Sequence, residues 1–269
     1  MDFNSIKNQD LPGKIFRSCR VNEVTISERS LLHDREFAIF DENGKFVNGK
    51  RTPEINKLRA FFDLENYLIK LEIEGSETIN VFNLTEEKPL LNKYLSDYFG
   101  YKVFVKQTPN GDFLDIPVYS GLTVLSTSTL HSLSEFFREI PIEQMRRRFR
   151  ANIEISGAEP LWEDHLFDKP GNAVEYKIGD VRLFGVAPRA RCIVPTRDPD
   201  NGITYPYFTK EFVEFRKNSL PENSLLPEYE HFYFLSVDTF IPDTENGKTI
   251  NTGDKIEIIG ISTLEELNI

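Results

Sequence analysis

Short stretches in which apolar and polar residues alternate dominate the first hundred residues and limit the folds open to this chain. A period of two places the apolar side chains on one face of a strand. Turn signals such as Asp41-Glu42-Asn43-Gly44 and Glu74-Gly75-Ser76 separate these stretches. Several short strands at this spacing favour a sheet closed into a barrel or sandwich over a parallel α/β sheet. The strands predicted in this half are 21–26, 36–40, 58–64, 69–73 and 79–81.

Helical spacing of apolar residues interrupts the strands in three places. Residues 89–99 have apolar side chains along one face and end at Gly100, which is a typical helix stop. Residues 127–137 follow a cap at Ser126 or Thr127, and residues 210–217 follow a cap at Thr209. Strands return at 122–125, 152–155, 176–184, 232–237 and 255–259. We therefore predict a mainly β chain with α+β elements and a domain boundary near residues 110–120.

The net charge of −11 argues against nucleic acid or an anionic membrane as partner, because phosphate surfaces attract a basic face. The sequence contains neither the roughly 18 consecutive apolar residues of a membrane span nor the apolar run of a signal peptide. Its two cysteines, Cys19 and Cys192, are few enough for a reducing compartment, so we expect a soluble, cytoplasmic protein.

The arginines are clustered, which suggests a local anion site within this acidic protein. Any one cluster alone is more often a solvated charged face. The clusters are Arg17 with Arg20, Arg35, Lys50 with Arg51, Arg146 to Arg148 with Arg150, and Arg189, Arg191 and Arg197 around Cys192.

Several common cofactors have no matching motif. The four histidines stand singly and no Cys-x-x-Cys occurs, so a structural zinc site is not expected. Two cysteines cannot supply the four thiolates of a ferredoxin-type cluster, so we expect no iron–sulfur cluster in this chain. Neither a Gly-x-Gly-x-x-Gly fingerprint nor a Walker loop is present to bind nicotinamide or ATP.

Cys192 is the strongest candidate for a chemically reactive residue. Arg189 and Arg191 flank it, and nearby positive charge favours the thiolate, which is the nucleophilic and metal-binding form of a cysteine. From its spacing alone, a small buried hydrophobic residue is the somewhat more frequent interpretation. Arg150 and Asn152 lie two residues apart, so they share a face if both belong to a strand; they could grip a phosphate and a heterocycle edge, or form a salt bridge and a turn.

These segments together resemble a MOSC-domain protein with its N-terminal MOSC β-barrel domain, of the kind found in molybdenum-cofactor amidoxime reductases. The Arg-Cys-x-x-x-Thr-x-Asp-Pro-x-x-Gly element from Arg191 to Gly202 is the specific part. The other matching elements are Ile15 to Arg20, Asp34-Arg35-Glu36-Phe37, Phe149-Arg150-Ala151-Asn152, Glu163-Asp164, Ile178-Gly179-Asp180 and Thr252-Gly253-Asp254. The resemblance implies an N-terminal β-barrel-like domain over residues 1–112, followed by a β-barrel MOSC domain with a few peripheral helices over residues 113–269.

The resemblance also implies site roles. Cys192 would be the catalytic residue and the thiolate ligand of molybdenum, which is bound through a pterin dithiolene. The implied cofactor-binding residues are Arg17, Ser18, Arg35, Ser120, Arg150, Asn152, Arg191, Thr196 and Asp198. The sequence departs from the family pattern at Arg17, Val21, around Ser120, at Ala151 and at Arg189, which affects loop geometry and substrate range more than cofactor binding.

The implied function is reduction of N-hydroxylated small molecules, such as amidoximes or hydroxylamines, by oxygen-atom chemistry at molybdenum. A separate protein would then donate the electrons. The alternative is a sulfur carrier or cofactor-handling protein that bears a persulfide on Cys192. A third possibility is a binding module that has kept the fold and lost the cofactor.

Overall fold

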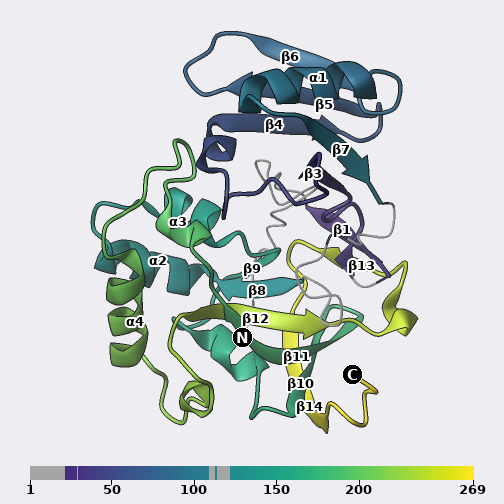
Figure 1. Cartoon of the computed structure of the whole chain (residues 1–269). Helices are drawn as coiled ribbons and strands as arrows, with labels where there is room; N and C mark the ends of the chain where they lie inside the picture. Colours follow the sequence, from purple (N-terminus) through teal and green to yellow (C-terminus); the bar gives the residue numbers. More distant parts are fainter. Residues whose placement is uncertain (1–21, 29, 109–112, 114–121) are drawn as a thin grey trace.

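The chain folds into two units joined by several contacts (Figure 1). The computed structural model describes residues 22–28, 30–108, 113 and 122–269. The chain is mainly β, as the alternating pattern predicts. In the described residues no helix is both long and apolar enough to cross a membrane.

The N-terminal unit contains two small antiparallel sheets and one helix. One sheet joins β4 (Leu58–Asp63), β5 (Leu68–Ile73) and β6 (Ile79–Asn83), and the other joins β3 (Phe37–Asp41) and β7 (Val103–Gln107). Helix α1 (Lys88–Phe99) ends at Gly100, whose φ of +75° suits glycine, so the predicted helix and its stop are confirmed. Leu71, Leu91 and Leu95 are completely buried between these elements and form the core of the unit.

The first described strand belongs to the other unit. β1 (Glu23–Ser27) pairs with β2 (Ser30–Leu31) and with β13 (Thr249–Asn251), which lies more than two hundred residues later. Val24 and Ile26 of β1 are buried in one cluster with Ile250 and with the large sheet. This crossover brings the segment that carries Asp34 and Arg35 next to the C-terminal unit. The predicted boundary at residues 112 and 113 lies at the edge of the undescribed residues and stays a prediction.

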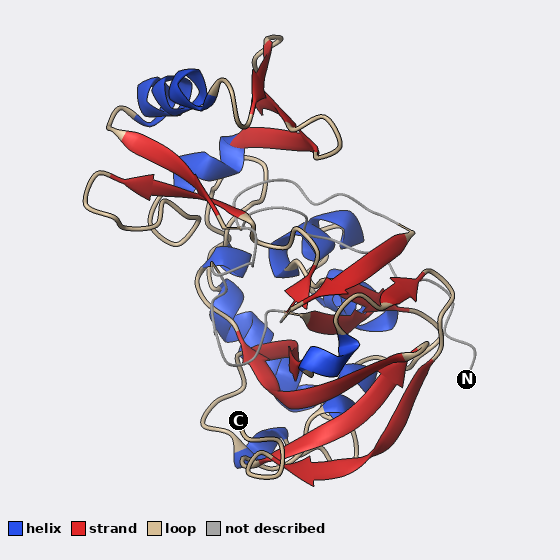
Figure 2. Cartoon of the chain, turned by 90° about the vertical axis from the view of Figure 1, so that its right-hand side faces the viewer, coloured by secondary structure: helices blue, strands red, loops and turns tan. Residues whose placement is uncertain are grey.

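The C-terminal unit is built on a curled six-stranded sheet in the order β14-β10-β11-β12-β8-β9, whose long curved strands are visible in Figure 2. All neighbouring strands are antiparallel except β8 and β9, which are parallel. The bounds are β8 (Thr123–Ser126), β9 (Ile153–Ile155), β10 (Asn172–Ile178), β11 (Val181–Ala190), β12 (Phe234–Phe240) and β14 (Ile256–Thr263).

The prediction of one strand over 176–184 is wrong, because these residues form a hairpin. Ile178 pairs with Val181, so Gly179 and Asp180 make a two-residue turn between β10 and β11. Gly179 has a φ of +57°, a conformation that favours glycine at this position of the turn. The apolar residues on both sides of the turn hid the break from a reading of hydrophobicity alone.

Three helices cover the sheet on the side of β8 and β9 (Figure 1). In α2 (Thr127–Phe136), the Ser126 hydroxyl accepts a hydrogen bond from Thr129 N at 3.1 Å, which confirms one of the two predicted caps. α4 (Phe208–Asn218) begins after Tyr207, so the predicted cap at Thr209 is wrong. α3 (Ile142–Phe149) was not predicted. Short 3₁₀ helices span Pro53–Lys57, Trp162–Leu166, Val194–Thr196, Leu226–Glu228 and Asp243–Glu245.

Candidate functional site

Cys192 lies where the chain leaves β11 and enters the 3₁₀ helix Val194–Thr196. It is a free, partly exposed cysteine. The Tyr233 hydroxyl donates a hydrogen bond to the Cys192 carbonyl at 3.2 Å, and Arg191 N donates to the Tyr233 carbonyl at 2.9 Å. Tyr233, which the sequence did not single out, therefore holds the backbone on both sides of the thiol.

Arg191 brings a partly buried positive charge next to this cysteine. Its Nη2 donates to the Phe149 carbonyl, and its guanidinium lies over the Phe149 ring at 5.2 Å from the centroid. Burial, followed by repulsion from Arg189, lowers the pKa of Arg191 to about 10. The guanidinium thus remains charged at neutral pH in a poorly solvated place, where its interaction with an anion is strong.

Asp238 of β12 is the carboxylate around which three predicted arginines gather. It is 3% exposed and accepts a hydrogen bond from Arg189 Nη1 at 2.5 Å. Burial raises the pKa of Asp238, while the charges of Arg189, Arg191 and Arg35 oppose that rise. Arg35 and Arg191, which are far apart in the sequence, therefore lie within electrostatic reach of one buried group. The sequence signal for Asp238 was that it is the single charged residue of its strand.

Asn152 fastens the Asp34-Arg35 turn to the large sheet. Its Oδ1 accepts hydrogen bonds from Thr123 N and Thr123 Oγ1, both at 3.0 Å, and its Nδ2 donates to Asp34 Oδ2 at 3.3 Å. Asp34 Oδ2 also accepts from Arg35 Nη1 at 3.2 Å. Asn152 is completely buried, so in this structure its amide binds protein groups and positions Arg35.

Two predicted site arginines have an unusual backbone. Arg35 has a φ of +55° and Arg150, which ends α3, has a φ of +47°. Non-glycine residues in this left-handed region are uncommon and concentrate at functional sites. Arg35 directly follows Asp34, and Arg150 comes two residues before Asn152. Because Asp34 and Asn152 are hydrogen-bonded to each other, the two strained positions lie close together.

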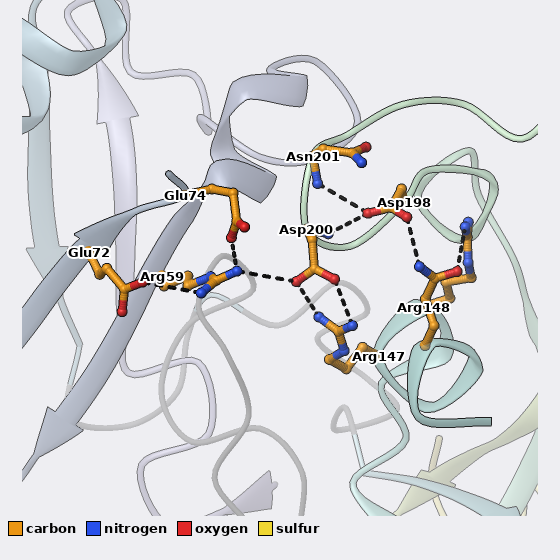
Figure 3. Close-up of polar contacts among 9 residues, drawn as sticks. Arg59, Glu72, Glu74, Arg147, Arg148, Asp198, Asp200 and Asn201 are labelled. Atoms are coloured by element: carbon orange, nitrogen blue, oxygen red, sulfur yellow. Dashed lines mark hydrogen bonds and ion pairs between the residues drawn. The ribbon is translucent and has the colours of Figure 1, made fainter. Parts of the chain in front are cut away.

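Thr196 and Asp198 shape the loop after Cys192. Thr196 Oγ1 donates to the Ile193 carbonyl at 2.7 Å. Asp198 Oδ1 accepts from Asp200 N at 2.8 Å and from Asn201 N at 3.1 Å, as Figure 3 shows. Asp198 Oδ2 also accepts from Gln144 Nε2 of α3 at 2.7 Å. Both side chains thus bind protein groups, whereas their predicted role was direct contact with a cofactor. Arg17, Ser18 and Ser120 lie outside the described residues.

The Arg146 to Arg148 cluster is not a free anion site. Arg146 pairs with Glu154 through Nε at 2.5 Å and Nη2 at 2.8 Å. Arg148 Nη1 donates to the carbonyls of Pro195 at 2.8 Å and Arg197 at 2.7 Å. These guanidinium groups hold the protein together, because α3 packs them against its neighbours. The prediction of an anion site here is corrected.

Other buried guanidinium atoms near Cys192 have no partner. Arg191 Nε, and Nε and Nη1 of Arg197, are buried without a hydrogen-bond partner in the described part of the chain. A buried donor left without a partner costs free energy, so such atoms mark a place where an oxygen-rich ligand could bind. No three His, Cys, Asp or Glu side chains gather as metal ligands among the described residues. The donor set therefore suits an anionic organic group better than a metal ion held by protein ligands alone.

Two protein-family models match this chain. The family model described as MOSC domain matches residues 119–257, and the one described as MOSC N-terminal beta barrel domain matches residues 11–96. The chain belongs to the MOSC domain family, which confirms the resemblance.

The curated relatives are molybdenum cofactor sulfurases. The protein from Homo sapiens is 23% identical over 257 residues, which cover 76% of this chain and 28% of the relative. The protein from Danio rerio is 26% identical over 201 residues, which cover 57% of this chain and 24% of the relative. The chain thus spans about a quarter of the length of these relatives. A solved structure described as a hypothetical protein aligns with 97% of this chain at 11% identity, with a TM-score of 0.39.

Proposed function

We propose that this chain handles the molybdenum cofactor and carries sulfur as a persulfide on Cys192. The observation that carries the proposal is a partly exposed free thiol beside Arg191, whose Nε has no partner in the described residues. A guanidinium can stabilise the negative charge of a persulfide through charge-assisted hydrogen bonds. The names of the curated relatives, which are cofactor sulfurases, support a role in sulfur chemistry over one in reduction.

Loading of Cys192 requires only a donor persulfide of the class R–S–SH. The Cys192 thiolate attacks the outer sulfur of the donor, a bond forms between Cys192 Sγ and that sulfur, and the sulfur–sulfur bond of the donor breaks. The thiolate R–S⁻ leaves and takes up a proton from water. One neutral sulfur atom changes partner, so the step consumes no external oxidant or reductant.

The residues around Cys192 fit an anionic pterin cofactor. Arg35, Arg150 and Arg191 would hold its phosphate and pterin, because guanidinium groups bind phosphate in two-pronged fashion. Asn152 would act indirectly, by holding the turn that carries Arg35. When bound, the cofactor supplies a molybdenum centre, for which soft sulfur is a suitable ligand.

Reduction of amidoximes or hydroxylamines, with electrons from a separate protein, is the second candidate function. The element from Arg191 to Gly202 favours it through its resemblance to the reductases. A partly exposed Cys192 could serve as a permanent metal ligand as well as a sulfur carrier. The two functions place different demands on this sulfur. A carrier must gain and release a sulfur atom at Cys192, whereas a reductase must keep Cys192 bound to the metal during turnover.

Intact-mass measurement tests the carrier function. Protein incubated with glutathione persulfide should gain one sulfur atom, which dithiothreitol should remove. C192S should lose this gain, and the matched control C19S should keep it, because Cys192 is then the only remaining cysteine. A gain of sulfur that persists in C192S would refute the assignment.

Pterin and metal analysis separates the candidates. In protein purified from a host that makes the cofactor, R191M should lower the pterin content, and R182M should not, because Arg182 pairs with Glu175 away from this site. Near-stoichiometric molybdenum that is lost in C192A, together with amidoxime reduction and no sulfur gain, would replace the carrier by the reductase.

A further inference from the structure

The segment that follows Cys192, residues 193–204 (the Cys192 loop), turns back on itself. Asp198 N donates to the Ile203 carbonyl at 2.7 Å, and Gly202 N donates to the Asp198 carbonyl at 2.9 Å. Arg197 and Thr204 also pair as an isolated antiparallel bridge. Because these contacts join the two arms of the loop and the loop starts at Cys192, we expect a displacement of its tip to move the cysteine.

Helix α3 holds this loop from one side. Arg148 donates to two loop carbonyls, and Arg147 grips Asp200 with both ends of its guanidinium, at 2.5 Å to Oδ1 and 2.8 Å to Oδ2. Such a two-pronged pair fixes direction as well as distance. The tip of the loop is therefore tied to the C-terminal unit through Asp200.

The N-terminal unit contacts the same loop from the other side. Arg59 Nη2 of β4 lies 4.0 Å from Asp200 Oδ1, and Arg197 Nη2 donates to the Lys50 carbonyl at 3.3 Å. A methyl group at Gly202 would lie 2.6 Å from the Pro53 carbonyl oxygen, so the backbones of the two units are in close contact there. Figure 3 shows Asp200 between Arg59 and Arg147.

Arg59 also separates Asp200 from two further carboxylates. It donates to Glu72 at 3.1 Å and pairs with Glu74, both on the N-terminal unit. Without the guanidinium, Asp200, Glu72 and Glu74 would face one another as like charges. Removal of Arg59 therefore does more than delete one partly exposed ion pair, because it creates repulsion between the loop and the N-terminal unit.

We propose that Asp200 is a positioning residue through which the N-terminal unit, by way of Arg59, holds the Cys192 loop and controls access to the thiol. The proposal deepens the proposed function, in which Cys192 is the reactive group, and it specifies what the small β unit does for that site. Asp200 does not react. It sets the distance between the two units at the point where the loop passes between them.

The test uses C19S protein, in which alkylation by iodoacetamide reports on Cys192 alone. R59M should raise the alkylation rate and the amide hydrogen exchange of the loop by about threefold to tenfold, the effect of a charge-assisted contact reduced by solvent. R59K should restore most of the parent rate. D200N keeps the shape of the side chain but removes its charge, so it should raise both rates in the same direction, by less than R59M because no like charges then face one another. R182M removes an arginine from a comparable ion pair elsewhere and should change neither rate.

Parent rates in both R59M and D200N would overturn the proposal. So would faster exchange spread evenly over the whole chain, which would indicate a general loss of stability. Alkylation requires only the thiol and involves neither a persulfide nor the cofactor. Failure of sulfur loading would thus leave this result intact, and the two proposals fail separately.

Discussion

Glu163 provides a quantitative test of the burial that shapes this fold. It lies in the 3₁₀ helix Trp162–Leu166 and is 0% exposed. Its Oε2 accepts hydrogen bonds from Ser126 N at 3.3 Å and Thr129 Oγ1 at 3.1 Å, and its Oε1 has no partner in the described part of the chain. Burial, followed by repulsion from Asp164, raises the pKa of Glu163 from 4.5 to about 7. The native state therefore keeps a proton that the unfolded chain releases.

The magnitude follows from linkage between proton binding and folding. Because the native pKa lies above the unfolded pKa, the contribution of Glu163 to stability is fully present below pH 4.5 and is lost as the pH rises through about 7. Between about pH 5 and about pH 8 this loss amounts to about 2–3 kcal/mol. In E163Q the side chain carries no titrating proton, so that part of the pH dependence should disappear.

The assay is urea denaturation of the parent and E163Q at about pH 5 and about pH 8, with the free energy of unfolding extrapolated to water. The loss in the free energy of unfolding from about pH 5 to about pH 8 should be about 2–3 kcal/mol larger in the parent than in E163Q. Asp164 and Asp238 also have raised pKa values, but they are present in both proteins and cancel. Equal pH dependence in the two proteins would refute the argument that Glu163 is desolvated.

Three further substitutions probe the contacts that position the site. In the parent, Arg216 Nη2 donates to the buried Asp164 at 2.8 Å. R216M leaves this carboxylate without its partner and should lower the free energy of unfolding, measured in urea, by about 3–5 kcal/mol. A loss below about 1 kcal/mol would contradict this. G202A places a methyl group against Pro53 at a φ of +77°, and calorimetry should show a loss of about 1–3 kcal/mol, whereas an unchanged melting temperature would mean that the units separate freely. N152A removes hydrogen bonds that join two chain segments and should cost about 1–3 kcal/mol in urea, with stability equal to the parent as the contrary result.

The secondary structure was predictable where one local signal dominated. Helix α1 is bounded by Gly100 and carries a clear apolar face, and Ser126 caps α2 through its own hydroxyl. α3 was missed because the polar run Arg146 to Arg148 interrupts its apolar spacing, although Met145 and Phe149 are buried. The hairpin at Gly179 was missed because the apolar residues Ile178 and Val181 on either side of the turn carry the apolar pattern across it.

The candidate site was predictable in its composition but not in its connections. Cys192 and Arg191 stood out because they are neighbours in sequence. Tyr233 holds the backbone and Asp238 gathers the arginines. They come from β12 and the residue before it, a segment that carried no motif. Local patterns identify chemically unusual residues, whereas a supporting residue becomes visible only when the chain folds back on itself.

The sequence by itself determined that this chain is mainly β, that its Arg191 to Gly202 element resembles the MOSC family, and that Cys192 is the candidate reactive residue. Only the tertiary structure decided which arginines are already paired with carboxylates. Arg147 is neutralised by Asp200, 53 residues away, and Arg189 by Asp238, 49 residues away. Whether a guanidinium pairs with a carboxylate is decided by contacts between distant segments, which the local sequence does not reveal.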